Sequence, residues 1–156
     1  MEALLAALEA TSWAQALRTS RWGYAALSTA HVLGLAILVG AIVPLDLRLL
    51  GVRTGVSTAV LTRVLAPMAA AGLALTIVTG GLLFSVRARE YAGLVVLQAK
   101  LMLVVVGTIS ALIAHLRHGP TLETASRSQL AAHGAISIAC WLGALVCGRM
   151  IAFAGE

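Results

Sequence analysis

Four long apolar stretches alternate with short polar segments along the 156 residues of the chain. They cover about residues 24–45, 64–86, 92–114 and 130–153. Each holds the roughly 20 mostly apolar residues that a helix needs to cross the hydrocarbon core of a bilayer. The alternation of apolar and polar residues expected for barrel strands is not visible in any of them. The pattern therefore predicts four membrane-spanning helices.

The polar segments between these stretches are short, and the Gly119-Pro120 pair marks a turn between the third and fourth. Short connections make consecutive helices neighbours, which predicts an up-down four-helix transmembrane bundle in an all-α integral membrane protein. Small residues at helix-packing intervals, such as Ala30–Gly34 and Thr76–Gly80, favour close helix contacts. We expect residues 1–156 to form a single membrane domain.

The N-terminal segment, residues 2–18, has leucines and a tryptophan on one face of a predicted helix. Such a segment is typical of a short helix that lies in the membrane interface. Trp22 and Tyr24 follow it and mark the boundary of the first span as part of an aromatic belt.

Composition narrows the class of protein further, since 60% of the residues are hydrophobic and only 11% are charged. A soluble domain of this size could not bury so much apolar surface. The net charge of +5 comes from few ionic residues and forms no basic stripe, so no nucleic-acid partner is expected. The sequence has no nucleotide-binding motif, and it lacks the CxxCH pattern of covalently attached haem.

Several polar side chains lie at membrane depth near one face of the bundle, which we name side A, the face where the first span begins. At 1.5 Å per residue, His31 lies about 10 Å deep, Lys100 about 12 Å and Arg149 about 6 Å. Polar groups in a bilayer are costly and often functional. His31 could ligate a metal or carry a proton, with Lys100, Met102 or Met150 as a further ligand.

Histidines also gather near the opposite face, side B. His115 ends the third span, and His133 lies at a similar depth in the fourth. Two histidines on facing helices can hold a haem iron between them, although histidines at a boundary are also ordinary polar caps. His31 and His115 lie near opposite faces and cannot share one iron, so one haem or two stacked haems are open alternatives. Asp46 is expected at the boundary of its span, so that no carboxylate lies deep in the bundle.

Residues 18–153 resemble an uncharacterised family of small four-span bacterial membrane proteins. The resemblance rests on AHVLGLAILVGAIVPLDLRLLG, LTRVLAPMAAAGLALTIVTGGLLF, LQAKLMLVVVGTISALIAH and SIACWLGALVCGRMIAF. It implies a multi-pass protein of the bacterial inner membrane. Four arginines flank the spans on side A and five on side B, so the positive-inside rule favours an N-terminus outside the cytoplasm.

The layout is more distantly similar to the HemJ-type membrane protoporphyrinogen oxidases and to CopD-like membrane domains. His31, Arg63, Pro67 and Lys100 match the HemJ pattern, which implies a haem-binding oxidase with a cavity of tetrapyrrole size. The Asn-Glu-Pro segment expected in the fourth span is absent, which leaves that activity open. Copper transport of the CopD kind would favour a ladder of Met or Cys ligands, and the four methionines form none.

These observations predict first a membrane protein that binds haem b and works in electron transfer. In this hypothesis His31, His115 and His133 are axial ligands, Trp141 packs against the porphyrin, and Arg149 and Arg21 pair with the propionates. The expected partners are the lipid bilayer, haem and a periplasmic redox protein or quinone, with a homo-oligomer left open.

Three alternatives remain. The first is an oxidase acting on a tetrapyrrole or quinone-like molecule, with His31 accepting a proton and Lys100 stabilising negative charge. The others are a permease-like protein for copper or another solute, and a scaffold subunit whose buried charges fix helix register.

Overall fold

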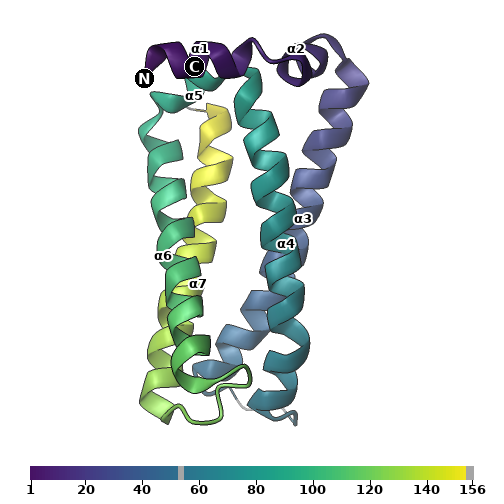
Figure 1. Cartoon of the computed structure of the whole chain (residues 1–156). Helices are drawn as coiled ribbons and strands as arrows, with labels where there is room; N and C mark the ends of the chain where they lie inside the picture. The colour runs from purple at the N-terminus through teal and green to yellow at the C-terminus, as the bar shows by residue number, and fades with distance from the viewer. Residues whose placement is uncertain (53–54, 154–156) are drawn as a thin grey trace.

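The computed structural model describes residues 1–52 and 55–153, and within these residues the chain is all-helical with no strand (Figure 1). Seven α-helices follow one another: α1 (Glu2–Glu9), α2 (Ser12–Thr19), α3 (Arg21–Leu49), α4 (Thr58–Val86), α5 (Ala88–Ala92), α6 (Val95–His118) and α7 (Arg127–Met150). A short 3-10 turn, Ile151–Phe153, ends the described part of the chain.

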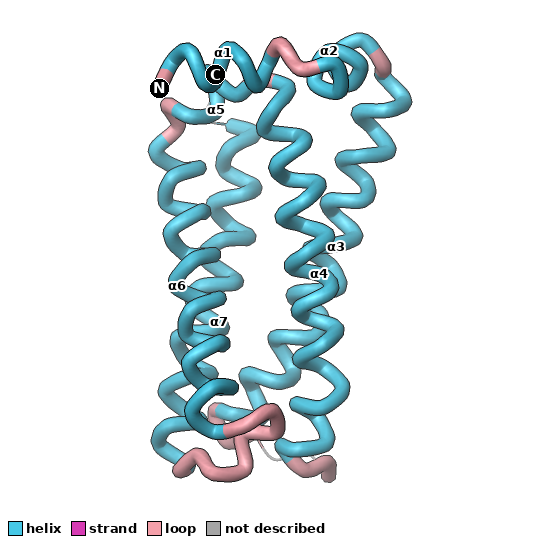
Figure 2. The backbone as a smooth tube through the Cα atoms, in the orientation of Figure 1, coloured by secondary structure: helices cyan, strands magenta, loops and turns pink. Residues whose placement is uncertain are grey.

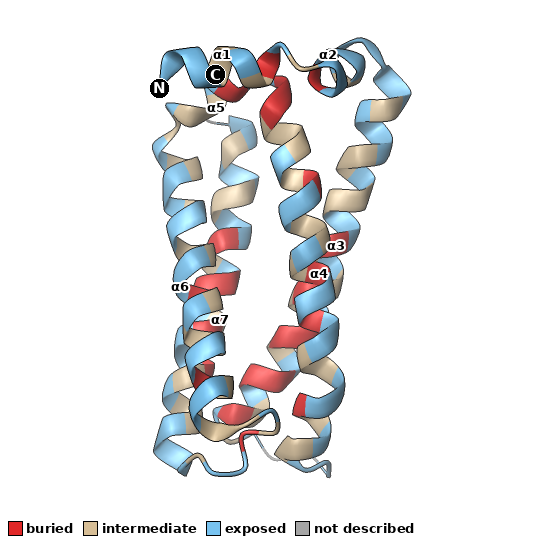
Figure 3. Cartoon of the chain, in the orientation of Figure 1, coloured by how far each residue is buried: buried red, intermediate tan, exposed pale blue. Residues whose placement is uncertain are grey.

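Helices α3, α4, α6 and α7 are long and apolar enough to cross a membrane, which agrees with the prediction of four spans. Their outward faces carry exposed aliphatic side chains such as Val32, Val78 and Val146. Buried residues line the inward faces instead (Figure 3). An apolar exterior around a partly polar interior indicates a multi-pass membrane protein in contact with a lipid bilayer.

The four long helices run side by side as alternating up and down elements, but they do not close into a complete ring. Helix α3 packs against both α4 and α7, and α7 packs against α6. Helices α4 and α6 form no close interface with each other in the described parts of the chain. The bundle therefore has the spatial order α4–α3–α7–α6, with an open seam between its first and last members.

The tightest packing lies between α3 and α4, where glycine lets two backbones meet. A Cβ added to Gly72 would lie 2.6 Å from the backbone nitrogen of Leu38 and 2.9 Å from the carbonyl oxygen of Gly34. A Cβ added to Gly34 would in turn lie 2.6 Å from Oγ1 of Thr76. No larger side chain fits at either position, so these two glycines fix the distance between the helices.

The buried core lies around the middle of the bundle, where α3, α4 and α7 meet. It consists of Leu38, Ala41, Ile42, Ala69 and Trp141. A smaller apolar cluster near side B joins α3, α6 and the loop before α7. Near side A, buried residues lie on α2, α4 and α5, among them Ala14, Val86 and Ala88 (Figure 3).

The N-terminal segment forms two helices, α1 and α2, where the sequence predicted one. Thr11 has an extended backbone conformation and its hydroxyl donates to the carbonyl oxygen of Leu8 at 2.6 Å, which interrupts the helix there. Both helices lie across the side A end of the bundle, roughly perpendicular to the spans (Figures 1 and 2).

Two polar contacts hold these helices onto the bundle. The carboxylate of Glu9 accepts hydrogen bonds from the backbone N–H of Arg89, at 2.9 Å, and from its guanidinium, at 3.0 Å. The guanidinium of Arg18 donates to the carbonyl oxygen of Val86, in the last turn of α4. The hydrogen bonds from Arg89 lower the pKa of Glu9 below its ordinary value.

The other differences from the predicted elements lie at helix ends. The third span begins at Val95 instead of Ala92, because residues 88–92 form the separate short helix α5. The turn predicted at Gly119-Pro120 is present, and Gly119 ends α6 with φ +78°, a conformation that glycine adopts readily. The span predicted over 130–153 is α7 followed by the 3-10 turn.

Candidate functional site: two cavities along the bundle

Two cavities lie one above the other in the bundle, each lined by residues of α3, α4, α6 and α7. The cavity nearer side A has a volume of about 350 Å³, and the side B cavity has a volume of about 400 Å³. Both volumes fall in the range of small-molecule and cofactor sites. Leu38, Leu73 and Trp141 line both cavities and form the apolar layer between them.

Both cavities reach the open seam between α4 and α6. In the side A cavity, the lining residues Ile77 on α4 and Leu101 on α6 are 58% and 54% exposed. In the side B cavity, Leu112 on α6 is 56% exposed and Pro67 on α4 is also exposed. These exposed lining residues show that each cavity is open to the outside of the bundle.

His31 lies in the side A cavity in a defined orientation. Its Nδ1 lies 2.9 Å from Oγ1 of Thr79, and that hydroxyl donates its only proton to the carbonyl oxygen of Leu75 at 2.6 Å. The hydroxyl can then only accept from the ring, so Nδ1 carries the ring proton. Nε2, the other ring nitrogen, then carries the lone pair.

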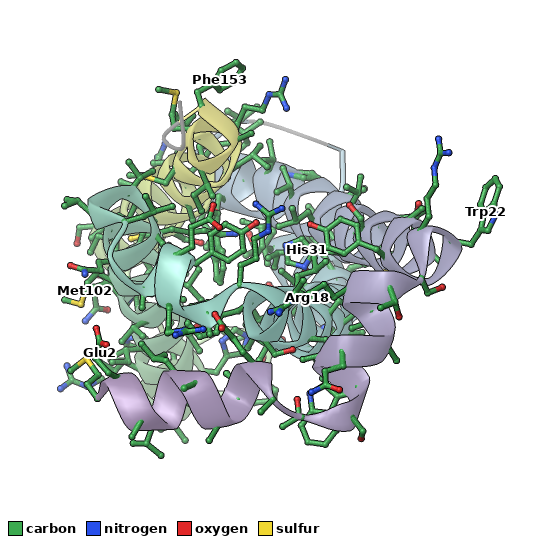
Figure 4. All side chains as sticks on the ribbon, turned by 90° about the horizontal axis from the view of Figure 1, so that it is seen from above. Glu2, Arg18, Trp22, His31, Met102 and Phe153 are labelled. Atoms are coloured by element: carbon green, nitrogen blue, oxygen red, sulfur yellow. The ribbon has the colours of Figure 1, made fainter. Side chains whose placement is uncertain are left out.

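Glycine makes room for this imidazole. A Cβ added to Gly80 would lie 3.0 Å from Cε1 of His31 and 3.5 Å from its Nδ1. The ring therefore lies directly against the backbone of α4, and its free edge remains on the cavity side. In Figure 4, His31 lies inside the bundle, whereas Met102 and Trp22 lie at its periphery.

Lys100 lines the same cavity from α6. A Cβ added to Gly148 on α7 would lie 3.3 Å from Nζ of Lys100, so the ammonium rests against a glycine of the neighbouring helix. Neither salt bridge in the described part of the chain includes Lys100. The hydroxyl of Thr76, which also lines this cavity, is buried with no hydrogen-bond partner. The cavity thus offers one unpaired cation in a mostly apolar space.

The other residues predicted near side A lie outside this cavity. Arg149 and Arg21 are exposed, and the guanidinium carbon of Arg149 lies 5.1 Å from the centre of the Phe153 ring. Met102 and Met150 are 64% and 49% exposed. Of the three residues predicted as a further ligand beside His31, only Lys100 lines the cavity.

Trp141 is 5% exposed and packs into the centre of the bundle. A Cβ added to Gly107 on α6 would lie 3.2 Å from its ring, so this glycine admits the indole. Its Nε1–H has no hydrogen-bond partner. The indole is therefore a wall that the two cavities share.

His115 lines the side B cavity, and its tautomer is also fixed by the structure. Nδ1 lies 2.9 Å from the carbonyl oxygen of Ala111, one turn earlier in α6. A carbonyl oxygen only accepts, so Nδ1 carries the proton and Nε2 has a free lone pair. Nε2 is buried and has no partner.

His133 lines the same cavity from α7, so the structure brings together the two histidines predicted to pair. Its Nδ1 lies 3.3 Å from the hydroxyl oxygen of Ser110. Its ring packs edge to face with the ring of His118, with 6.3 Å between the ring centres. His133 therefore already has polar and aromatic neighbours within the protein, whereas Nε2 of His115 has none.

Asp46 also lines the side B cavity, and the sequence reasoning gave it no role there. It was expected at the boundary of its span, but α3 continues to Leu49 and Asp46 is 2% exposed at the side B cavity. Its Oδ2 has no hydrogen-bond partner, and Ser137 lies beside the carboxyl group. Leu45 and Leu49, one helical turn apart on either side of Asp46, were the available signal that the helix extends past the predicted end.

The two cavities differ in their polar groups. The side A cavity combines an imidazole and a lysine ammonium that has no carboxylate partner, within apolar walls. The side B cavity has two histidines and a buried carboxyl group. No group of three or more His, Cys, Asp or Glu side chains gathers in the described ranges as it would around a bare metal ion.

A scan of protein-family models and searches of curated proteins and of solved structures found no match for this chain. The two cavities are therefore the features of this protein that bear on its function.

Proposed function

We propose that this chain is a membrane protein of the bacterial inner membrane that binds haem b in the side A cavity and works in electron transfer. The observation that supports it is the imidazole of His31, with Nδ1–H held by Thr79 and Nε2 left free in a cavity of about 350 Å³. Protein ligands to haem iron are commonly held in this way, with the other ring nitrogen donating to a fixed acceptor. The N-terminus lies outside the cytoplasm in this proposal.

Each of the main residues of the side A cavity has a different role in binding haem. Nε2 of His31 supplies the lone pair for the iron, and Thr79 keeps the ring from turning. Lys100 either pairs with a propionate or supplies a second ligand, since its ammonium has no carboxylate partner in the protein. The bound haem would supply a reversible one-electron couple. Trp141 and the leucines around it exclude water from the inner end of the cavity.

A second candidate function follows from Lys100. An unpaired ammonium in an apolar cavity also suits a carboxylate-bearing substrate, such as a tetrapyrrole, and His31 could accept a proton from it. This is the oxidase of the HemJ type that the sequence resembles. The apolar layer of Leu38, Leu73 and Trp141 between the cavities favours either binding function over a solute permease, which would need a continuous polar path.

The first experiment is a reduced-minus-oxidised visible spectrum of the protein purified in detergent, with haem measured per chain. We expect the bands of a b-type haem, their loss in His31→Gln and their retention in His115→Gln. His118→Gln is the matched control, because His118 is outside both cavities. A colourless wild-type protein after expression with added haem would refute the haem proposal.

Lys100→Met separates the two candidate functions. In an electron-transfer protein, the variant shifts or weakens the haem bands. In an oxidase, it keeps the haem bands and loses the oxidation of a porphyrinogen, measured by the fluorescence of the porphyrin product. The second candidate would be excluded if Lys100→Met leaves the haem bands unchanged and the wild-type protein oxidises no porphyrinogen.

A further inference from the structure

The side B cavity contains two buried groups whose hydrogen bonding is incomplete. Oδ2 of Asp46, on α3, and Nε2 of His115, on α6, are shielded from solvent and have no partner. Both residues line the same cavity of about 400 Å³. Buried polar groups are nearly always hydrogen-bonded, so two unpaired ones beside one cavity indicate a missing partner.

The chemistry of the two groups defines that partner. Nε2 of His115 can only accept, because its ring proton is on Nδ1. A carboxylate oxygen also accepts. A ligand that satisfies both therefore presents two hydrogen-bond donors, as two hydroxyl groups would. Imidazole and carboxyl groups also take up and release protons readily, which suits a ligand that is oxidised with loss of two protons.

The walls of the cavity add two further requirements. They are mostly aliphatic, with the indole of Trp141 at the inner end, so the body of the ligand is apolar and preferably aromatic. Pro67 and Leu112 line the cavity at the open seam between α4 and α6. The ligand therefore reaches the cavity from the bilayer and leaves an apolar tail in the lipid.

We propose that the side B cavity binds a membrane-soluble hydroquinone, which donates one hydroxyl to Nε2 of His115 and the other to the carboxyl group of Asp46. This site is separate from the haem site proposed above. The role proposed for it is to bind the hydroquinone. It assigns a role to Asp46, and it makes His115 a ligand-binding residue instead of an iron ligand. A hydroquinone here would lie across Trp141 from the side A cavity, in position to serve as an electron donor.

The test measures binding through quenching of Trp141 fluorescence, in a Trp13→Phe, Trp22→Phe background. Trp13 and Trp22 are 51% and 83% exposed and line neither cavity, so the remaining signal comes from Trp141. The probe is a decyl-tailed naphthohydroquinone, added without oxygen to protein in nanodiscs. Its dimethyl ether is the control ligand, because it has nearly the same shape and no hydroxyl donor.

We expect saturable quenching by the hydroquinone, with a Kd about tenfold higher for the ether. Asp46→Asn and His115→Gln should each raise the Kd for the hydroquinone about tenfold. Glu123→Gln and His118→Gln, which change the same residue types outside the cavity, should leave the Kd unchanged. The comparison of the two ligands needs only the background protein, so it holds even if a cavity variant folds poorly.

Three outcomes would overturn this inference. The first is equal affinity for the hydroquinone and its ether, and the second is binding that Lys100→Gln weakens while Asp46→Asn does not. The third is loss of the haem bands in His115→Gln, recorded on the same samples, which would make the side B cavity a haem site. A colourless protein that still binds the hydroquinone would refute only the haem proposal.

Discussion

Thr79 on α4 holds the imidazole of His31 on α3, with 2.9 Å between Oγ1 and Nδ1. Because Thr79 donates its own proton to Leu75, the hydroxyl acts only as an acceptor towards the ring. The contact therefore selects one tautomer of His31 and directs its free nitrogen. Thr79 is a positioning residue in the proposed haem site, since it acts through His31.

The variant Thr79→Val tests this relationship. Valine keeps the shape of threonine but cannot accept from Nδ1, so the ring loses its fixed tautomer. We expect the affinity for haem to fall about tenfold, in line with the effect of losing a hydrogen bond behind a metal ligand. The measurement is a titration of the haem-depleted protein with haem, followed by its absorbance. Thr79→Ser restores the acceptor and should retain the wild-type affinity, and equal affinities for the two variants would contradict the role of Thr79.

A substitution at Gly80 provides a second test, of whether haem binding depends on the position of the His31 ring. A methyl group at this position would lie 3.0 Å from Cε1 of His31, so Gly80→Ala must displace the imidazole. We expect lower haem occupancy with normal expression. Gly40→Ala is the matched control, because a Cβ there meets nothing within 4 Å and alanine favours the helix. Full haem occupancy in Gly80→Ala would show that the ring does not need this contact.

The sequence predicted the elements that depend on local composition. The four spans follow from the length of each apolar stretch, and Gly119-Pro120 follows from the restricted backbone of its residues. The sequence did not predict the break at Thr11. There the hydroxyl of Thr11 donates to the carbonyl oxygen of Leu8, which would otherwise accept from a backbone N–H of a continuing helix. Boundaries of this kind depend on single hydrogen bonds, which apolar periodicity does not reveal.

The arrangement of the candidate site was only partly predictable. Depth along the spans placed His31 with Lys100 and His115 with His133, and each pair lines one cavity. Depth does not tell which way a side chain faces, so Arg149 was grouped with His31 although it packs on Phe153 outside the cavity. The open seam between α4 and α6 comes from tertiary packing, and no local pattern predicts it.

Gly72 should be the glycine at which substitution is most damaging to stability. Its added Cβ would meet backbone atoms of α3, at 2.6 Å from the nitrogen of Leu38, and backbone cannot rotate away. We expect Gly72→Ala to destabilise the protein by about 1–3 kcal/mol, the usual cost of overpacking. Thermal unfolding in detergent, with Gly40→Ala as the control, measures the difference. A melting temperature equal to that of the control would contradict the close approach of α3 and α4.

The contact between Glu9 and Arg89 should release α1 from the bundle in acid. Hydrogen bonds from Arg89 lower the pKa of Glu9 below its ordinary value of 4.5. The contact is therefore fully present above pH 4.5, and it weakens as the pH falls through the lower pKa of the folded protein. We expect amide hydrogen exchange in residues 2–9 to increase below that pH, after correction for the intrinsic rates.

Two variants test whether loss of the contact between Glu9 and Arg89 causes this release of α1. Glu9→Gln cannot ionise, so α1 should exchange quickly and show no such dependence on pH. Arg87→Gln removes the partner of Glu90 in an exposed pair at 3.4 Å and should leave the exchange of α1 as in the wild-type protein, because exposed pairs contribute little. Slow exchange of residues 2–9 in Glu9→Gln at neutral pH would show that apolar packing alone holds α1 against α5.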